Sequence, residues 1–409
     1  MGARIVLGVG GGIAAYKVCE LLRRMTEAGH SVRVVPTAAA LRFVGQPTWE
    51  ALSGQSVAAD VFTEVPEVAH VRIGKHADLV VVAPATADLL ARAAHGIADD
   101  LLTNTLLTAR CPVLFVPAMH TEMWEHPATV ENVATLRRRG AIVLEPAVGR
   151  LTGVDSGKGR LPEPDQIFEV VRRLLRRGPA ASADLAGRHV VVTAGGTREF
   201  LDPVRFLGNS SSGKQGYAFA RTAAARGARV TLVAANVSLP DPAGVDLVRV
   251  TTTEQMRVAV LQAADTADAV IMAAAPADYR PAVYSPVKLK KTDEGAPPVL
   301  ALERNPDIAA ELGRKKRTGQ VLVAFAAETE AGQTGVENAR AKLIAKNADY
   351  VVLNVVGRDK VFGADDNAVT VIDTQGEVRA FDPAPKDDIA DAIWDLVAAR
   401  WTAAEVSDV

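Results

Sequence analysis

A glycine cluster at residues 10–12 is the first feature that could do chemistry, because it follows an apolar run and precedes a helical pattern. Glycines at such a turn let backbone N–H groups approach a phosphate at the start of a helix. A tight turn between a strand and a helix needs the same glycines, so the cluster alone leaves both interpretations open. Ile13 stands where the third glycine of a dinucleotide fingerprint belongs, and the next apolar run ends at residues 35–37 without an acidic residue to hold an adenine ribose. A mononucleotide such as FMN therefore fits this turn better than NAD.

Two histidines lie near the ends of later apolar runs in the same half of the chain. A loop at residues 83–88 follows the third predicted strand, at the carboxyl edge where parallel sheets bind ligands. His70 precedes that strand, and His120 follows the fourth one. An isolated histidine is more often a surface or capping group than a catalyst. Two histidines near one predicted flavin pocket make an acid–base role about as plausible as the structural one.

The second half contains another glycine turn at residues 193–199 and a small-residue loop at residues 208–216. The loop has the spacing of a P-loop, but Gln215 replaces the Ser or Thr whose hydroxyl would bind Mg2+. The preceding residues 202–206 also make a poor strand, so a true P-loop is not favoured. A small-residue loop that opens a helix can still bind an anion.

Lysines form two further candidate anion sites. Lys342 and Lys346 are four residues apart on one predicted helical face, so both ammonium groups could meet adjacent phosphates. Such a pair is also common on solvent faces, although this one follows a strand end and turn at residues 323–329. Lys288 belongs to a lysine cluster at residues 288–291, which by itself is more typical of a solvated loop.

The elements that must position these residues are strands and helices that alternate along both halves of the chain. In the first half the predicted strands are residues 4–8, 32–36, 79–83, 113–116 and 142–144. In the second half they are residues 189–193, 229–234, 269–274, 321–325 and 350–353. This alternation predicts an α/β fold with two doubly wound, Rossmann-like domains.

The length of 409 residues is too great for one domain of ordinary size. Residues 179–187 read as a small-residue linker after a basic helix end. We therefore predict a first domain at residues 1–178 and a second at residues 188–409.

The composition excludes several other classes of protein. Hydrophobic residues make up 48% and charged residues 23%, which is ordinary for a globular chain. A net charge of −2 and an aromatic fraction of 5% give no sign of nucleic-acid binding. Two cysteines suit a reducing cytoplasm, and no apolar run approaches the roughly 20 residues that span a membrane.

The first half resembles the homo-oligomeric flavin-containing cysteine decarboxylases, which include the phosphopantothenoylcysteine decarboxylases. The resemblance rests on residues 10–17, 83–88, 117–119 and 157–164. It implies that His70 is the active-site histidine and acts as acid and base while FMN oxidises the substrate thiol. The predicted FMN-binding residues are Gly11, Gly12, Ile13, Ala14, Thr37, Pro84, Ala85 and Thr86.

Two positions depart from the pattern of this decarboxylase family. His120 replaces an asparagine that contacts the substrate carboxylate, and Gly153 falls where a cysteine supplies a proton for the final reduction. Related enzymes without that cysteine stop at the enethiol. We therefore predict that His120 donates the proton in this chain.

The second half resembles the phosphopantothenate–cysteine ligases through residues 193–199, 202–216, 273–280, 288–291, 305–308, 325–329 and 342–347. The resemblance implies that Lys288 promotes formation of an acyl-cytidylate and that Asn209 serves its conversion by L-cysteine. It also implies a requirement for Mg2+, for which Asp278 is the predicted protein ligand. The implied CTP-binding residues are Ala273, Ala274, Ala275, Asp278, Lys288, Asn305, Pro306, Asp307, Ile308, Phe325, Lys342 and Lys346.

The order of the two halves resembles the bifunctional bacterial coenzyme A biosynthesis family. The implied substrates are 4′-phosphopantothenate, L-cysteine and CTP, and the implied product is 4′-phosphopantetheine. The resemblance further implies a homo-oligomer with trimeric decarboxylase units and dimeric ligase units, together forming a dodecamer. The alternative is a ligase whose first domain binds flavin but serves regulation or assembly, with impaired decarboxylase activity.

Overall fold

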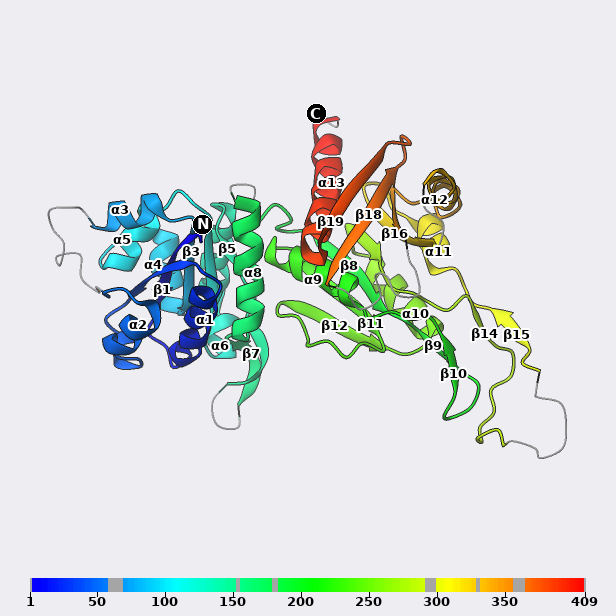
Figure 1. The fold of residues 1–409 in the computed structure, drawn as a ribbon, viewed down its shortest axis with the longest axis horizontal. Helices are drawn as coiled ribbons and strands as arrows, with labels where there is room; N and C mark the ends of the chain where they lie inside the picture. Colours follow the sequence, from blue (N-terminus) through cyan, green and yellow to red (C-terminus); the bar gives the residue numbers. More distant parts are fainter. Residues whose placement is uncertain are drawn as a thin grey trace. The chain divides into compact units, whose positions relative to one another are not determined.

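The computed structural model describes residues 2–57, 69–151, 155–178, 183–290, 299–328, 332–355 and 365–407. The chain divides into two compact units, the first formed mainly by residues 1–186 and the second mainly by residues from 187 onward. Each unit consists of a central β-sheet with helices packed against it (Figure 1).

The first unit contains a parallel sheet with the strand order β2-β1-β3-β4-β5. The strands are β1 (Arg4–Val9), β2 (Ser31–Pro36), β3 (Leu79–Ala85), β4 (Val113–Pro117) and β5 (Ile142–Val143). The chain leaves β1 in opposite directions to reach β2 and β3, so the ligand-binding switch point of a doubly wound sheet lies between β1 and β3. All seven residues of β3 are buried, which explains its continuous apolar run.

Helices and one hairpin complete the first unit. They are α1 (Ala15–Glu27), η1 (Ala40–Arg42), α2 (Gln46–Ser53), α3 (Ala69–His76), α4 (Ala87–His95), α5 (Leu101–Thr108), α6 (Thr121–Trp124), α7 (Pro127–Arg138) and α8 (Pro164–Arg177), with β6 (Ala147–Arg150) paired to β7 (Ser156–Arg160). Helix α1 forms where the spacing of apolar residues predicts it, and its face of Val18, Leu21, Leu22 and Met25 is fully buried. Gly29 follows with a φ of 84° and reverses the chain into β2.

The second unit contains an eight-stranded sheet with the order β12-β11-β8-β13-β16-β17-β18-β19. The strands are β8 (His189–Gly195), β11 (Arg229–Ala235), β12 (Val245–Val250), β13 (Ala269–Met272), β16 (Val321–Glu328), β17 (Tyr350–Val355), β18 (Asp366–Asp373) and β19 (Val378–Pro385). The strands from β12 to β17 are parallel, and β18 and β19 are antiparallel additions. The chain order reverses between β8 and β13, so the switch point lies there.

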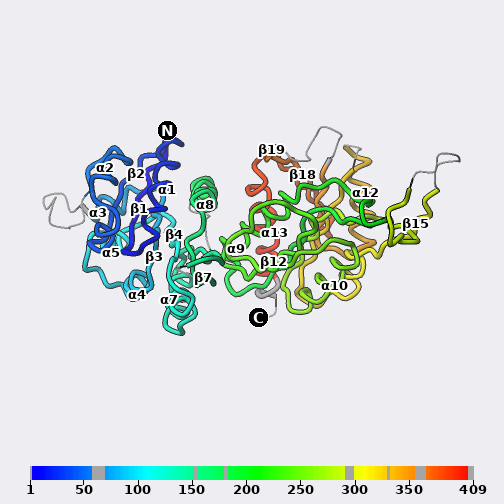
Figure 2. The backbone as a smooth tube through the Cα atoms, turned by 90° about the horizontal axis from the view of Figure 1, so that it is seen from below, coloured from blue at the N-terminus to red at the C-terminus, as the bar shows by residue number. Residues whose placement is uncertain are grey.

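Helices and two short hairpins surround this second sheet. The helices are α9 (Lys214–Ala225), α10 (Thr253–Ala264), α11 (Ile308–Lys315), α12 (Gln333–Ala345) and α13 (Lys386–Ser407). The hairpins pair β9 (Arg198–Phe200) with β10 (Phe206–Gly208) and β14 (Tyr279–Pro281) with β15 (Leu302–Arg304), and β15 extends away from the main sheet (Figure 2).

All ten predicted strands are present, and the predicted α/β class is confirmed. The strand predicted at residues 269–274 ends earlier, at Met272. Strand β12 and the β18–β19 hairpin were not predicted. In β12 and β19 most positions are exposed or half-buried, so neither carries the continuous apolar run of a central parallel strand. No helix in the described part of the chain is long and apolar enough to cross a membrane.

Candidate active sites

The glycine turn of the first unit is shaped by close contacts between backbones. The Gly10 amide donates to the Pro84 carbonyl at 3.1 Å, and a Cβ at Gly10 would lie only 2.3 Å from that oxygen. A Cβ at Gly11 would lie 2.3 Å from the Cβ of Ala39. Side chains are excluded at both positions, so the turn brings together the loops after β1, β2 and β3. The predicted FMN-binding residues lie on these loops.

Backbone amides in this turn are available to an anion. The amides of residues 15–17 donate to carbonyls of the same turn, whereas within the described residues those of Gly11, Ile13 and Ala14 have no backbone acceptor. Thr86 caps the start of α4, and its hydroxyl accepts from Leu89. An arrangement of open amides and a helix N-terminus at a switch point fits the phosphate of FMN.

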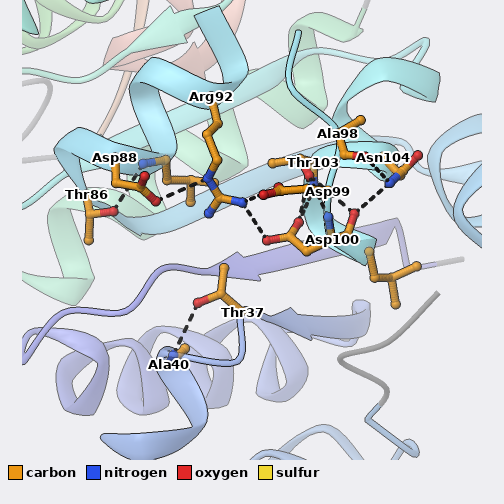
Figure 3. Close-up of polar contacts among 12 residues, drawn as sticks. Thr37, Ala40, Thr86, Asp88, Arg92, Ala98, Asp99, Asp100, Thr103 and Asn104 are labelled. Carbon is orange, nitrogen blue, oxygen red and sulfur yellow. Dashed lines mark hydrogen bonds and ion pairs between the residues drawn. The ribbon is translucent and has the colours of Figure 1, made fainter. Parts of the chain in front are cut away.

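An ion-pair network holds the loop between α4 and α5. The Arg92 guanidinium contacts Asp88 at 3.1 Å, Asp99 at 2.7 Å and Asp100 at 2.9 Å (Figure 3). Burial opposes the charge of Arg92, but hydrogen bonds to Asp100 and Asp99 outweigh it and raise the pKa of the guanidinium. Asp100 also forms a capping box with Thr103 at the start of α5. Of these residues, only Asp88 belongs to a loop that stood out in the sequence, at residues 83–88. The others carry no local signal, because only the fold brings both helix ends to one arginine.

The two predicted catalytic histidines have different surroundings. His70 lies in the first turn of α3, where the Thr108 hydroxyl donates to its backbone carbonyl at 2.8 Å. His120 is exposed immediately before α6 and makes no capping hydrogen bond. Among the described residues no hydrogen bond joins the two side chains, so their joint action stays a prediction.

The β6–β7 hairpin packs against the loop that carries His120. The Met119 amide donates to the Gly159 carbonyl at 3.0 Å, and a Cβ at Gly159 would lie 2.1 Å from the Met119 carbonyl oxygen. The prediction for Gly153 falls outside the described residues. The described strands of the hairpin nevertheless place residues 156–160 beside His120.

The second unit has a pocket of about 580 Å³ beside the switch point between β8 and β13. The predicted residues that line it are Asn209, Ala273, Ala274, Ala275, Asp278, Asn305, Pro306, Asp307, Ile308, Phe325, Lys342 and Lys346. These residues come from segments far apart in the sequence, and one cavity collects them. The pocket is the strongest structural support for the predicted nucleotide site.

Buried polar side chains fix the wall of the pocket at residues 273–278. The Thr193 hydroxyl accepts from the Ala274 amide at 3.0 Å, and the Thr197 hydroxyl accepts from the Ala277 amide at 2.8 Å. The Asn305 side chain donates to the Ala277 carbonyl at 2.9 Å. This wall is therefore held in place by hydrogen bonds before any ligand binds.

The paired lysines both line the pocket, but each contacts a carboxylate. Lys342 Nζ lies 2.5 Å from Glu328, and Lys346 Nζ lies 3.1 Å from Asp307. Burial opposes the ionisation of Asp307, whereas the Ala310 amide and Lys346 lower the pKa of its carboxyl group below the ordinary value. Each ammonium group therefore has its own carboxylate partner in this structure, and their joint contact with adjacent phosphates stays a prediction.

Lys288 is exposed and is not among the residues that line the pocket. Its neighbour Leu289 donates to the buried Asp202 carboxylate at 3.1 Å, which ties this segment to the turn before β10. Residues 291–298 fall outside the described residues. The assigned role of Lys288 therefore stays a prediction that requires this segment to approach the pocket.

Two carboxylates line the pocket, those of Asp278 and Asp307, and Asp307 is already paired with Lys346, so Asp278 is the one offered to a divalent cation. The described residues contain no cluster of three or more His, Cys, Asp or Glu side chains that could hold a metal. Mg2+ commonly binds through one or two carboxylates together with the phosphates of a substrate. The residues present therefore fit Mg2+ bound with a nucleotide, in contrast to a site built from protein ligands alone.

Seven polar residues that line the pocket were not predicted individually as ligand-binding groups: Ser211, Ser212, Lys214, Gln215, Asn354, Asn367 and Lys386. Lys214 and Gln215 lie in the loop that resembles a P-loop, which was a signal for an anion. Asn354 Oδ1 is buried without a hydrogen-bond partner among the described residues. Asn367 and Lys386 lie in the unpredicted β18–β19–α13 segment and had no sequence signal.

The fold and the two sites define a chain with a flavin-binding unit followed by a nucleotide-binding unit. Residues 1–176 match the model of the Flavoprotein family, and residues 185–400 match that of the DNA/pantothenate metabolism flavoprotein C-terminal domain. The pair of matches covers both units.

Relatives of known name extend over nearly the whole chain. Three of them are called "Coenzyme A biosynthesis bifunctional protein CoaBC". The protein from Mycobacterium tuberculosis is 57% identical over 401 residues, which is 96% of each chain. That from Mycolicibacterium smegmatis is 57% identical over 97% of each chain, and that from Bacillus subtilis is 44% identical over 97% of this chain and 96% of its own.

The chain belongs to the family of coenzyme A biosynthesis bifunctional proteins. It is a bifunctional enzyme with phosphopantothenoylcysteine decarboxylase and phosphopantothenate–cysteine ligase activities. The family resemblance inferred from the sequence motifs is confirmed.

Proposed function

We propose that the second unit joins 4′-phosphopantothenate to L-cysteine with CTP and Mg2+, and that the first unit converts the product to 4′-phosphopantetheine with FMN. The observation that carries the proposal is the 580 Å³ pocket, which collects nearly all of the predicted CTP-binding residues at the switch point of the second sheet. The enzyme is proposed to act in the cytoplasm. Incubation with phosphopantothenate, cysteine, CTP and Mg2+ tests the proposal, because it should yield CMP, diphosphate and phosphopantetheine.

In the ligase step, the substrate carboxylate attacks the α-phosphorus of CTP. The bond between the α-phosphorus and the oxygen that bridges to the β-phosphorus breaks, and diphosphate leaves with the electron pair. Asp278 would hold Mg2+ together with the phosphates, and the cation would offset the charge of the leaving group. Asn209 lines the same pocket, and its side-chain amide donates to the Pro276 carbonyl at 2.8 Å. This hydrogen bond positions the side chain for the later step, in which cysteine attacks the acyl-cytidylate.

In the decarboxylase step, bound FMN supplies the two-electron oxidation and reduction. The residues for holding it are Gly11, Gly12, Ile13, Ala14, Thr37, Pro84, Ala85 and Thr86. His70 takes up the proton that the substrate thiol loses, and His120 returns a proton during the final reduction. Residues 156–160 of the β6–β7 hairpin lie beside His120 and cover the substrate there.

We expect the purified protein to be yellow, with FMN bound without a covalent bond. Gly11→Ala should lower FMN content at least about tenfold, because a Cβ 2.3 Å from that of Ala39 must displace the loop. Gly45→Ala is a matched control, since its Cβ would meet only Pro47 at 3.6 Å. Absorbance spectra and FMN titration measure the FMN content. A colourless parent protein that takes up no FMN would refute the prediction that FMN is the cofactor.

We expect an oligomer with trimeric decarboxylase units and dimeric ligase units, assembled as a dodecamer. Ile13 and Tyr16 follow the glycine turn and are 68% and 62% exposed, an arrangement that favours burial against another subunit. Light scattering at micromolar concentration measures the mass. A value near the 43.1 kDa of one chain would contradict the expectation.

The second candidate function keeps the ligase but gives the first unit a regulatory or assembly role. The presence of His120 in place of the family's asparagine favours it. In that case, product analysis should end at phosphopantothenoylcysteine, with no loss of CO2 even when FMN is bound.

A further inference from the structure

The C-terminal part of the second unit supplies a cation to the ligase pocket. Lys386 is the first residue of α13, which packs against β18 and β19 (Figure 1). It is only 7% exposed, yet it lines the pocket together with Lys214 and Gln215 at the start of α9. None of the motifs that identify the family includes Lys386.

Hydrogen bonds lock Lys386 to the first turn of α9. The Gln215 side chain donates to the Lys386 carbonyl at 3.3 Å, and the Asn367 side chain donates to Gln215 Oε1 at 3.1 Å. Lys386 Nζ donates to the Asp366 carbonyl at 3.1 Å. An ion pair of 2.8 Å between Arg221, about two turns further along α9, and Asp387, the residue after Lys386, joins the same two helices. The ammonium group is thus fixed relative to the start of α9.

The charges around this ammonium group favour an anion. Burial lowers the pKa of Lys386, nearby Lys214 lowers it further, and Asp365 and Asp366 act in the opposite direction. Lys214 itself contacts Asp365 at 2.8 Å, but that carboxylate is 91% exposed and therefore well screened by water. The N-terminus of α9 adds partial positive charge. A buried lysine beside a second lysine and a helix N-terminus in one pocket lining is a favourable setting for a bound anion.

We propose that Lys386 is a binding residue for the outer phosphates of the nucleotide and stabilises diphosphate as it leaves. This inference rests on the proposed use of CTP. CTP and phosphopantothenate both carry a phosphate group that Lys386 could bind, and the observations favour CTP. The loop at residues 208–216 has a nearly P-loop spacing, and Lys214 begins the helix that follows it.

Three variants and a control test the proposal in the full-length enzyme. Lys386→Gln removes the charge, Lys386→Met keeps the apolar stem in its buried position, and Lys386→Arg keeps the charge. Lys315→Gln removes an exposed lysine of α11 that is 63% accessible and is not among the pocket residues. Calorimetry measures the binding of CTP, CMP and diphosphate, and kinetics measure the KM for CTP and for phosphopantothenate.

We expect Lys386→Gln and Lys386→Met to weaken CTP and diphosphate binding about tenfold or more and to leave CMP binding unchanged. Lys386→Arg should restore part of the loss, and Lys315→Gln should match the parent. An equal loss for CMP and CTP would show a structural role and overturn the proposal. If only the KM for phosphopantothenate rises, Lys386 binds the phosphate of phosphopantothenate, and the proposal is overturned. If the parent enzyme binds no CTP, the proposed function itself fails.

Discussion

Lys288→Gln is expected to abolish the release of diphosphate from CTP, with a loss of about 100-fold to 1000-fold in the ligase rate. The physical reason is the loss of a cation that offsets charge developing on the phosphates. Lys288 is exposed, and its segment is tied through Leu289 to the buried Asp202. Glutamine keeps most of the side chain length, so folding should not change. Release of diphosphate in the presence of phosphopantothenate and CTP, before cysteine is added, measures this step alone.

Asn209→Asp is the matched variant that separates the two ligase half-reactions. The substitution keeps the size of the side chain but replaces the amide that donates to the Pro276 carbonyl with a carboxylate. Diphosphate should still be released and the acyl-cytidylate should accumulate, because only the cysteine step is affected. Lys290→Gln, an exposed lysine of the same segment, serves as the control. If Lys288→Gln and Asn209→Asp release diphosphate equally and neither traps the intermediate, the assignment of roles is wrong.

His120→Asn is expected to retain decarboxylation but to lose the final reduction. The product should be two hydrogens lighter than phosphopantetheine, as an enethiol, and the flavin should remain reduced. The reason is that an imidazole can donate a proton near neutral pH, whereas an amide cannot. The substitution should be tolerated by the fold, because His120 occupies the cap position before α6 without a capping hydrogen bond and asparagine favours that position.

The thiol of Cys111 is an alternative source of this proton. Burial raises the pKa of this thiol, which packs beside the partly buried hydrophobic residues around β4, so it is a poor donor. His126→Asn is the matched control, since His126 caps α7 by accepting from Ala128 and asparagine can do the same. Mass spectrometry measures the mass of the product, and absorbance shows whether the flavin remains reduced. Fully reduced product formed at the parent rate by His120→Asn would disprove its role as donor.

The sequence determined the parallel core of each unit. Central strands such as β3 and β8 are buried along their whole length, so they appear as uninterrupted apolar runs. Residues 10–12 and 83–88 also stood out locally, because glycine and small residues mark turns where a strand meets a helix. In the second unit, motifs that follow successive strands had to converge, since the carboxyl ends of parallel strands share one edge of a sheet. The pocket contains most of those motifs for this reason.

Contacts between distant segments were decided by the tertiary structure alone. Gln215 and Lys386 are 171 positions apart, and their hydrogen bond depends on where α13 docks after the β18–β19 hairpin. Strand β19 is largely exposed and contains two prolines, so its sequence lacks the apolar pattern that indicates a buried strand. Lys342 and Lys346 share the spacing of neighbours on a helix, yet each contacts a different carboxylate, Glu328 and Asp307 respectively. A local pattern fixes which face a side chain occupies, whereas the charge that it meets there is set by residues that only folding brings near.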